Sequence, residues 1–225
     1  MTEDLYGDGI GSVSLVESMG SDLTIVNAAR VSFGVEKDEV DSKDKKLINY
    51  LVKNRHTSTL EHNVITFKFV VPLFVARQHM RHRTWSYNEI SRRYTSENIQ
   101  FYLPSEFKKQ HKTDRQASDD NLVPNQGHNR YIFQAAYRTA WAAYNDLIKH
   151  GVSREQARMI LPVNLYTEYY GTVNLNNLLK FIDLRLDSHA QWEIQQVASA
   201  CLNIATGLWP EAVNAWNNRN VKKVE

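Results

Sequence analysis

Arginine is concentrated in one short stretch near the middle of the chain. Between Arg77 and Tyr94 there are five arginines and a single acid, Glu89. Like charges this close repel one another unless an anion lies among them. Guanidinium groups suit phosphate oxygens, and the neutral side chains of Ser86, Asn88 and Ser91 could orient a heterocycle. The stretch therefore predicts a site for a small phosphorylated ligand.

Two other interpretations of this stretch remain open. It could be a solvated basic loop whose arginines pair with acids elsewhere in the chain. It could also bind single-stranded nucleic acid, because Trp85, Tyr87 and Tyr94 alternate with the arginines as stacking platforms would. The basic residues are confined to one segment, however, and the flanking predicted helices carry no extended basic stripe. We therefore favour a small ligand and expect no nucleic-acid partner.

Other reactive side chains give weaker signals. The only cysteine, Cys201, lies in an apolar series at helical spacing, as Ile194, Val197, Ile204 and Leu208 do. Cysteines on such a stripe are usually buried and inert, so a thiol nucleophile is not expected. Histidines at positions 56, 62, 79 and 82 do not follow a zinc-ligand spacing, and we expect no metal site.

Length and composition indicate one globular unit. The 225 residues, 42% of them hydrophobic and 23% charged, are enough for a single domain spanning 1–225 with a buried core. The formal net charge of +2 does not by itself suggest a polyanionic partner. The opening residues do not resemble a signal peptide, and no apolar run approaches membrane-spanning length. We expect a cytoplasmic protein with no membrane partner.

The elements that must position these residues follow an α+β pattern in which helices outnumber strands. Strands are predicted at 12–17, 63–71 and 165–173 from β-branched and aromatic content. Asp22 is predicted to cap a first helix, and Ser153 with Gln156 matches a capping box. Gly151 is placed to end a preceding helix that contains Ile132 to Leu147. The remaining predicted helices are 22–31, 42–52, 73–82, a helix ending at 186, and 189–208. The polar stretch 104–127 is predicted to be a long surface loop that could hold a helical turn.

The arginine-rich stretch resembles a known family signature. Residues 81–94 match R-H-R-x-x-S-x-N-E-x-S-x-R-Y, typical of flavin-dependent thymidylate synthases, at all nine fixed positions. Residues 56–62 resemble a second family segment, H-x-T/S-P-x-E-H. Residues 158–162 and 174–193 also resemble family segments in the expected order, so the resemblance covers nearly the whole chain.

The resemblance implies a fold, an activity and an assembly. The implied fold is the thymidylate synthase-complementing fold, with a central, mainly antiparallel sheet flanked by helices. The implied reaction is the reductive methylation of dUMP to dTMP, with methylenetetrahydrofolate as carbon donor and NADPH-reduced FAD as hydride source. The implied assembly is a homotetramer with shared active sites. Two phosphorylated ring systems stacked in one pocket would explain the arginine density.

The resemblance also assigns roles to particular residues. Catalytic roles fall to Arg185 against the uracil, where a fixed cation would stabilise developing negative charge, to Ser91 as a positioning group, and to His56. The implied FAD ligands are Ser32, Ser58, Glu61, Arg81, His82, Arg83, Asn88, Glu89, Asn174, Asn176, Lys180 and His189. The implied dUMP ligands are Gln78, Arg81, Glu89, Ile90, Ser91, Arg92, Arg93, Arg158 and Arg185.

Three positions depart from the family pattern. Thr59 stands where relatives often have proline, which predicts a less rigid turn. Asn176 and Lys180 stand where relatives often have arginine and asparagine. Because these two positions share a helix face, the positive charge could have moved by one turn, from 176 to 180.

Overall fold

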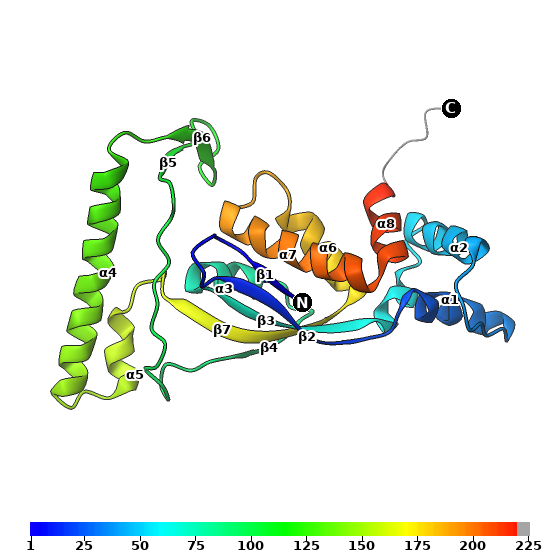
Figure 1. Ribbon diagram of the computed structural model, residues 1–225, viewed down its shortest axis with the longest axis horizontal. Coiled ribbons are helices and arrows are strands. Elements are labelled where there is room, and N and C mark those ends of the chain that lie inside the picture. Colours follow the sequence, from blue (N-terminus) through cyan, green and yellow to red (C-terminus); the bar gives the residue numbers. More distant parts are fainter. Residues whose placement is uncertain (220–225) are drawn as a thin grey trace.

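The computed structural model describes residues 1–219 and is organised around a five-stranded sheet in the order β1–β2–β3–β7–β4 (Figure 1). Every neighbouring pair of strands is antiparallel. The predicted α+β fold with a mainly antiparallel sheet is therefore confirmed. The strands of this sheet are β1 (Thr2–Asp4), β2 (Ser12–Met19), β3 (Val64–Pro72), β4 (Ser86–Glu89) and β7 (Tyr166–Asn174).

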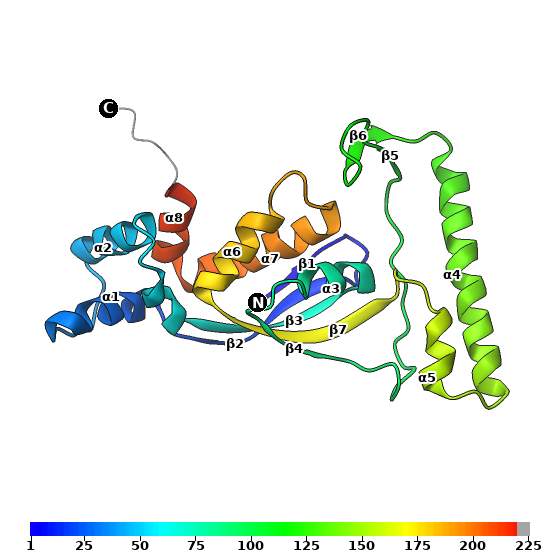
Figure 2. The ribbon, with the colours of Figure 1, turned by 180° about the vertical axis from the view of Figure 1, so that it is seen from behind.

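One face of the sheet forms the core. Along β3, Ile65, Phe67 and Phe69 are fully buried because their side chains alternate toward the helices. Helices α3, α6 and α7 cover this face in both views (Figures 1 and 2). The opposite face is polar: Thr66 and Thr172 share a hydroxyl hydrogen bond of 2.9 Å. The strand predicted at 63–71 from its β-branched and aromatic content is therefore present, and its alternating burial identifies the buried side.

The helices lie mostly where their periodicity predicts. Helices α1, α2 and α8 gather at one end of the sheet, whereas α4 stands at the other end with α5 (Figure 1). No helix within residues 1–219 has the length and apolarity needed to cross a bilayer. The helices are α1 (Asp22–Arg30), η1 (Val31–Phe33), α2 (Ser42–Lys53), η2 (Thr57–His62), α3 (Leu73–His79), α4 (Gln126–Lys149), α5 (Arg154–Ala157), η3 (Arg158–Ile160), α6 (Leu175–Arg185), α7 (Trp192–Leu208) and α8 (Pro210–Asn218).

Gly151 follows the end of α4 as predicted, with a positive φ of 83°, but the predicted cap at Asp22 and the predicted capping box at Ser153 were wrong. Ser21, not Asp22, caps α1, and it forms a capping box with Thr24. Asp22 instead accepts hydrogen bonds from the backbone N–H groups of Glu211 and Ala212, both at 3.0 Å, and so caps α8. Ser153 makes no side-chain cap, because the N–H of Gln156 bonds the Ser153 carbonyl at 3.0 Å instead.

Segments 1–19 and 104–127 contain strands that were not predicted. The predicted surface loop holds no helical turn but a two-stranded ribbon of β5 (Lys108–Gln110) and β6 (Ser118–Leu122). Its last residues already belong to α4, which begins at Gln126. These strands and β1 are short and polar, so they carry no hydrophobic alternation for a sequence to reveal. Helix boundaries also shift: α3 ends three residues before the predicted 82, and α7 begins three residues after the predicted 189.

A set of paired charges joins α1 to α2, and we call Arg30, Lys37, Asp41 and Asp44 the α1–α2 charge cluster. The Asp44 side chain has no exposed surface and accepts from Arg30 at 2.5 Å and from Lys37. Lys37 also bonds Asp41 at 2.6 Å. Burial alone would raise the pKa of Asp44, but the hydrogen bonds from Lys37, the Asp41 backbone and Arg30 hold it well below its usual range. Every charge of this cluster has a partner inside the protein.

Candidate active site

The arginine-rich stretch folds as a turn, an edge strand and a second turn. Residues 81–83 form the first turn after α3, and β4 then pairs with β7 from Ser86↔Thr172 to Glu89↔Tyr169. Because side chains alternate along a strand, Glu89 lies on the same side as the half-buried Tyr87 and Asn88 on the opposite side, although Glu89 and Asn88 are both exposed. A single strand therefore presents signature residues to both faces of the sheet.

Aromatic residues hold this strand and its turn in place. His79 is fully buried, with its Nδ1 atom 2.8 Å from the Tyr169 hydroxyl and its ring edge-on to Trp85 at 4.5 Å. The Tyr87 hydroxyl donates to the carbonyls of His79 and His82, at 3.0 and 3.2 Å. These contacts fix the backbone from which Arg81, His82 and Arg83 project.

Glycine is required where β7 passes behind Trp85. A Cβ atom on Gly171 would lie 2.9 Å from the Phe69 ring and 3.2 Å from the Trp85 ring. Both rings belong to the packed core, so neither can easily move aside. Close approach of β7 therefore depends on the missing side chain.

A cavity of about 450 Å³ opens beside the end of β4. Its walls come from the start of α3, the segment after β4, η3 and the start of β7. Five of the nine predicted dUMP ligands line it: Glu89, Ile90, Ser91, Arg92 and Arg158. Sequence reasoning missed the buried Thr167, and it counted Arg77 among the five arginines of the central stretch without giving it a role.

The arginines of this cavity lack carboxylate partners within residues 1–219. Its three arginines, Arg77, Arg92 and Arg158, form no ion pair within residues 1–219. Arg92 donates to the carbonyls of Glu97 and Tyr166, at 2.7 and 3.3 Å, and its buried Nε has no partner. Burial lowers the pKa of Arg92. The cavity can therefore accept an anion without breaking an existing ion pair.

Arg185 is held by two other predicted site residues. Its Nε donates to His82 Nε2 at 3.1 Å, and a terminal nitrogen donates to the Gln78 carbonyl at 3.0 Å. Desolvation, aided by the charge of Arg185, lowers the pKa of His82 to about 4. His82 is therefore neutral at pH 7 and accepts a hydrogen bond without adding charge. The guanidinium plane of Arg185 is fixed in orientation as a result.

Five of the twelve predicted FAD ligands occupy a different place, the corner between η2 and the start of α6. Asn176 is buried and donates to Glu61 Oε1 at 2.7 Å, while its own Oδ1 atom is buried without a partner. Asn174 caps α6 by accepting from the Asn177 N–H at 3.0 Å. The same corner carries His56, Ser58 and the exposed Lys180.

The departures from the family pattern lie in this corner too. Thr59 replaces the rigidity of a proline with a hydrogen bond, since its hydroxyl donates to the His56 carbonyl at 3.2 Å. Asn176 is buried while Lys180, one turn later, is exposed. The positive charge of Lys180 therefore lies nearer to solvent than the side chain of Asn176. FAD contacts at Asn176 and Lys180 remain predictions.

The other predicted ligands lie apart from the cavity. Ser32 is exposed in η1, where its hydroxyl donates to the Ala29 carbonyl at 3.2 Å. His189 is exposed and bonded to Asp187 at 2.8 Å. Arg93 approaches Glu155 at 3.7 Å. Arg81, Arg83 and Asn88 are exposed. Within residues 1–219, the predicted site residues thus form several groups rather than one closed pocket.

Neither hydroxyl nor thiol is activated as a nucleophile. Cys201 has no exposed surface, and burial raises the pKa of its thiol. The Ser91 hydroxyl oxygen accepts from the Arg93 N–H at 3.3 Å, and no base within residues 1–219 bonds it. The expectation of a buried cysteine is confirmed, and electrostatic chemistry is left to the guanidinium groups.

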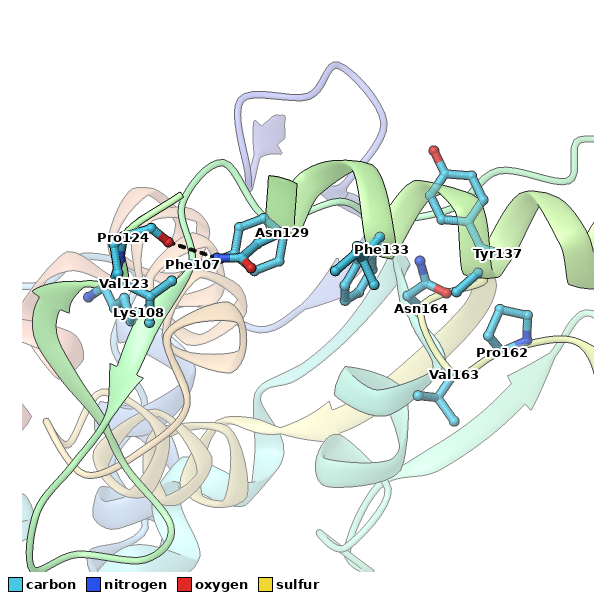
Figure 3. A pocket seen from close by; sticks show the side chains of 12 residues that line it. Phe107, Lys108, Val123, Pro124, Asn129, Phe133, Tyr137, Pro162, Val163 and Asn164 are labelled. Carbon is cyan, nitrogen blue, oxygen red and sulfur yellow. Dashed lines mark hydrogen bonds between the residues drawn. The ribbon is translucent and has the colours of Figure 1, made fainter. Parts of the chain in front are cut away.

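A larger cavity, of about 710 Å³, lies between α4, the β5–β6 ribbon and residues 162–164 (Figure 3). Apolar side chains such as Phe107, Phe133 and Val163 dominate its lining. It contains none of the predicted site residues and no acid or arginine. We therefore assign the candidate active site to the smaller, charged cavity.

Comparisons with known proteins show which family the chain resembles. The sequence model described as "Thymidylate synthase complementing protein" matches residues 14–211. A flavin-dependent thymidylate synthase of Thermus thermophilus is 47% identical over 194 residues, which cover 86% of this chain and 71% of that protein. One from Thermotoga neapolitana is 46% identical over 197 residues, covering 86% and 85%. Among solved structures, the UMP/dUMP methylase PolB of Streptomyces cacaoi, bound with 5-Br dUMP, superposes with a TM-score of 0.85 at 35% identity, covering 96% of this chain and 97% of that one.

Proposed function

We infer the function from a premise that is now established: the chain belongs to the thymidylate synthase complementing family, as the signature at 81–94 predicts. The protein is a flavin-dependent thymidylate synthase that methylates dUMP to dTMP, with methylenetetrahydrofolate as carbon donor and NADPH-reduced FAD as hydride source. The observation that carries this function is the cavity beside β4, whose arginines have no carboxylate partner and whose walls contain signature residues.

The cavity would hold the nucleotide. Its unpaired guanidinium groups suit the phosphate, since Arg92 and Arg158 offer several N–H donors in a planar fork. Ser91 and Glu89 supply polar groups for the sugar and base, and Ile90 adds an apolar wall. In this arrangement phosphate contacts supply the affinity, while the neutral and acidic groups set the orientation.

Arg185 would polarise the uracil. With Nε bonded to His82 and one terminal nitrogen bonded to Gln78, the remaining N–H groups keep a fixed direction. A fixed cation stabilises negative charge that develops on N3 and its neighbouring carbonyl oxygen. The fully buried Cys201 cannot take part in a covalent alternative without opening the core.

The corner between η2 and α6 fits part of a flavin nucleotide. The buried, unpartnered Oδ1 of Asn176 can accept a hydrogen bond, as an adenosine amine or ribose hydroxyl would offer. Glu61 and Asn174 lie beside it, and the exposed guanidinium groups of Arg81 and Arg83 suit a diphosphate. When bound, the flavin supplies hydride-transfer chemistry, while these residues bind and orient it.

We also propose that the protein assembles as a homotetramer with shared sites. The predicted FAD ligands are spread over η1, η2, α6 and the turn after α3 rather than gathered in one cavity. Large apolar side chains are exposed beside both ends of the sheet, including Phe33 in η1 at 83% and Met159 in η3 at 74%. A second copy could cover such surfaces and complete the FAD site.

The direct test is an assay for dTMP formation. Purified protein incubated with dUMP, methylenetetrahydrofolate, FAD and NADPH should form dTMP, and the FAD-bound protein should absorb near ~450 nm. Omitting FAD from flavin-free protein should abolish the product. A colourless protein that takes up no FAD would overturn the proposal and favour a nucleotide-binding module.

A variant tests the electrostatic mechanism. Cys201→Ala should keep kcat within about twofold of the wild type, since the thiol is buried and unactivated. Its stability should fall by about 1 kcal/mol because a small core cavity is created. Complete loss of turnover in a folded variant, judged by circular dichroism, would instead indicate a thiol nucleophile.

A further inference from the structure

A buried hydroxyl holds the acidic side chain of the nucleotide cavity. Thr167 is only 4% exposed, and its hydroxyl donates to Glu89 Oε1 at 2.5 Å. Both residues line the cavity. The threonine hydroxyl is enclosed by the protein, and the exposed side chain of Glu89 supplies its acceptor.

This contact matters because of what surrounds it. Glu89 is the only acid that lines the cavity, and it shares the walls with Arg77, Arg92 and Arg158. A carboxylate free to rotate among guanidinium groups would bond one of them, since such charge-assisted pairs are the stronger contacts. Yet Glu89 makes no ion pair within residues 1–219.

The backbone on both sides of the contact is fixed. Thr167 stands opposite Val71 in the β3–β7 pairing, and Glu89 stands opposite Tyr169 in the β4–β7 pairing. The N–H of Ile90 also donates to the Glu168 carbonyl at 2.9 Å. With both backbones anchored, the hydroxyl determines which way the carboxylate turns.

We propose that Thr167 is a positioning residue that keeps Glu89 from pairing with the cavity arginines, so that they stay available for the phosphate monoester of a nucleotide. The nucleotide part rests on the proposed function, whereas phosphate binding does not. Without the hydroxyl, the carboxylate competes with phosphate for the same guanidinium groups.

Thr167→Val removes the hydroxyl and keeps the shape of the side chain. The dissociation constants of dUMP and of inorganic phosphate, measured by calorimetry on the FAD-loaded protein, should each rise about tenfold, as expected for one charge-assisted hydrogen bond. In turnover assays KM for dUMP should rise similarly while kcat stays within twofold. Thr167→Ser keeps the donor and should restore wild-type binding.

Thr66→Val provides the matched control. Thr66 also loses a hydroxyl hydrogen bond within the same sheet, to Thr172 at 2.9 Å, but on the face away from the cavity. It should leave both dissociation constants unchanged. Thermal unfolding of all variants separates a loss of folding from a loss of binding.

A double variant distinguishes competition between the Glu89 carboxylate and phosphate from a change in the shape of the cavity. Glu89→Gln removes the negative charge, so adding Thr167→Val to it should weaken phosphate binding by less than twofold. A full tenfold loss in both backgrounds would overturn the proposal, as would unchanged phosphate binding in Thr167→Val. Should the wild type bind no FAD or form no dTMP, phosphate binding to the flavin-free protein would still decide the role of Thr167.

Discussion

The α1–α2 charge cluster and the cavity beside β4 use the same chemical groups in opposite ways. In the first, Arg30 and Lys37 are satisfied by Asp44, whose side chain has no exposed surface. In the second, Arg92 and Arg158 have no carboxylate partner within residues 1–219, and the nearby Glu89 is bonded to a threonine instead. The cluster is complete without a ligand, and the cavity is not.

The difference teaches where to look for a binding site. A buried ion pair with all its hydrogen bonds formed has a structural role, whereas cations without a carboxylate partner in a cavity indicate an anion-binding site. The alternative that the arginines pair with acids elsewhere does not hold for the cavity residues. It holds in part for Arg93, which approaches Glu155 at 3.7 Å.

The largest expected effect is on the complete cluster. Asp44→Asn leaves Arg30 and Lys37 without their buried acceptor charge and should reduce the free energy of unfolding by about 3 kcal/mol. Urea unfolding measures this loss, and KM for dUMP should not change. Asp38→Asn, an exposed acid in the preceding loop, is the control. A loss below 1 kcal/mol would mean that the cluster is not structural.

The next effect is on the incomplete site. Arg185→Lys keeps the charge but loses the planar fork, so it can no longer bond both His82 and Gln78 and present a fixed face. We expect kcat to fall about 100-fold, which corresponds to about 2.7 kcal/mol, with FAD affinity unchanged in absorbance titrations. Unchanged turnover would remove Arg185 from the catalytic role.

The α1–α2 charge cluster and the Arg185–His82 contact should differ in how pH affects stability. The pKa of His82 is lowered to about 4, so between pH 6.5 and 4 the unfolded chain binds a proton that the native protein does not. Stability therefore falls as pH drops through this window, and His82→Gln should remove a loss on the order of 1 kcal/mol, because solvent reaches about half of the group.

Asp44 responds in a separate window. Its lowered pKa means that its contribution is present above the ordinary aspartate range and is lost only as pH falls further. Unfolding curves of the wild type, His82→Gln and Asp44→Asn at pH 7, 5 and 3 separate the two. Identical pH profiles for all three proteins would contradict both assignments.

The smallest effect is expected at the exposed pair. Glu155→Gln should change the free energy of unfolding by less than about 0.5 kcal/mol, since both side chains of the Arg93–Glu155 pair are close to half exposed or more. If Arg93 contacts dUMP, freeing it from the Glu155 carboxylate should lower KM for dUMP by no more than about twofold. A large destabilisation would instead give the Arg93–Glu155 pair a structural role like that of the α1–α2 charge cluster.

The sequence predicted those helices and strands that carry their own local or amphipathic sequence pattern. Strand β3 was predicted because its segment is rich in β-branched and aromatic residues, and α7 because its apolar stripe includes Cys201. Strand β4 was missed because its four residues are polar and become a strand only by pairing with β7. Asp22 was assigned to the wrong helix because α8, which it caps, lies 189 residues away along the chain.

The site was predicted residue by residue but not as an arrangement. The signature and the family resemblance gave Glu89, Ser91, Arg92 and Arg158, which the structure brings into one cavity. The Arg185–His82 bond joins residues 103 positions apart, and Thr167 lies outside every motif. Such contacts depend on the tertiary fold, so no local spacing could reveal them.

Because β4 is a strand, the spacing of the signature residues decides on which face of the sheet each side chain lies. Tyr87 and Glu89 point one way and Ser86 and Asn88 the other, in step with the partner strand. Removing or adding one residue here would exchange the sides, turning the acid away from its threonine and an amide toward the core. A change in length within these four positions should therefore be more damaging than any single substitution among them.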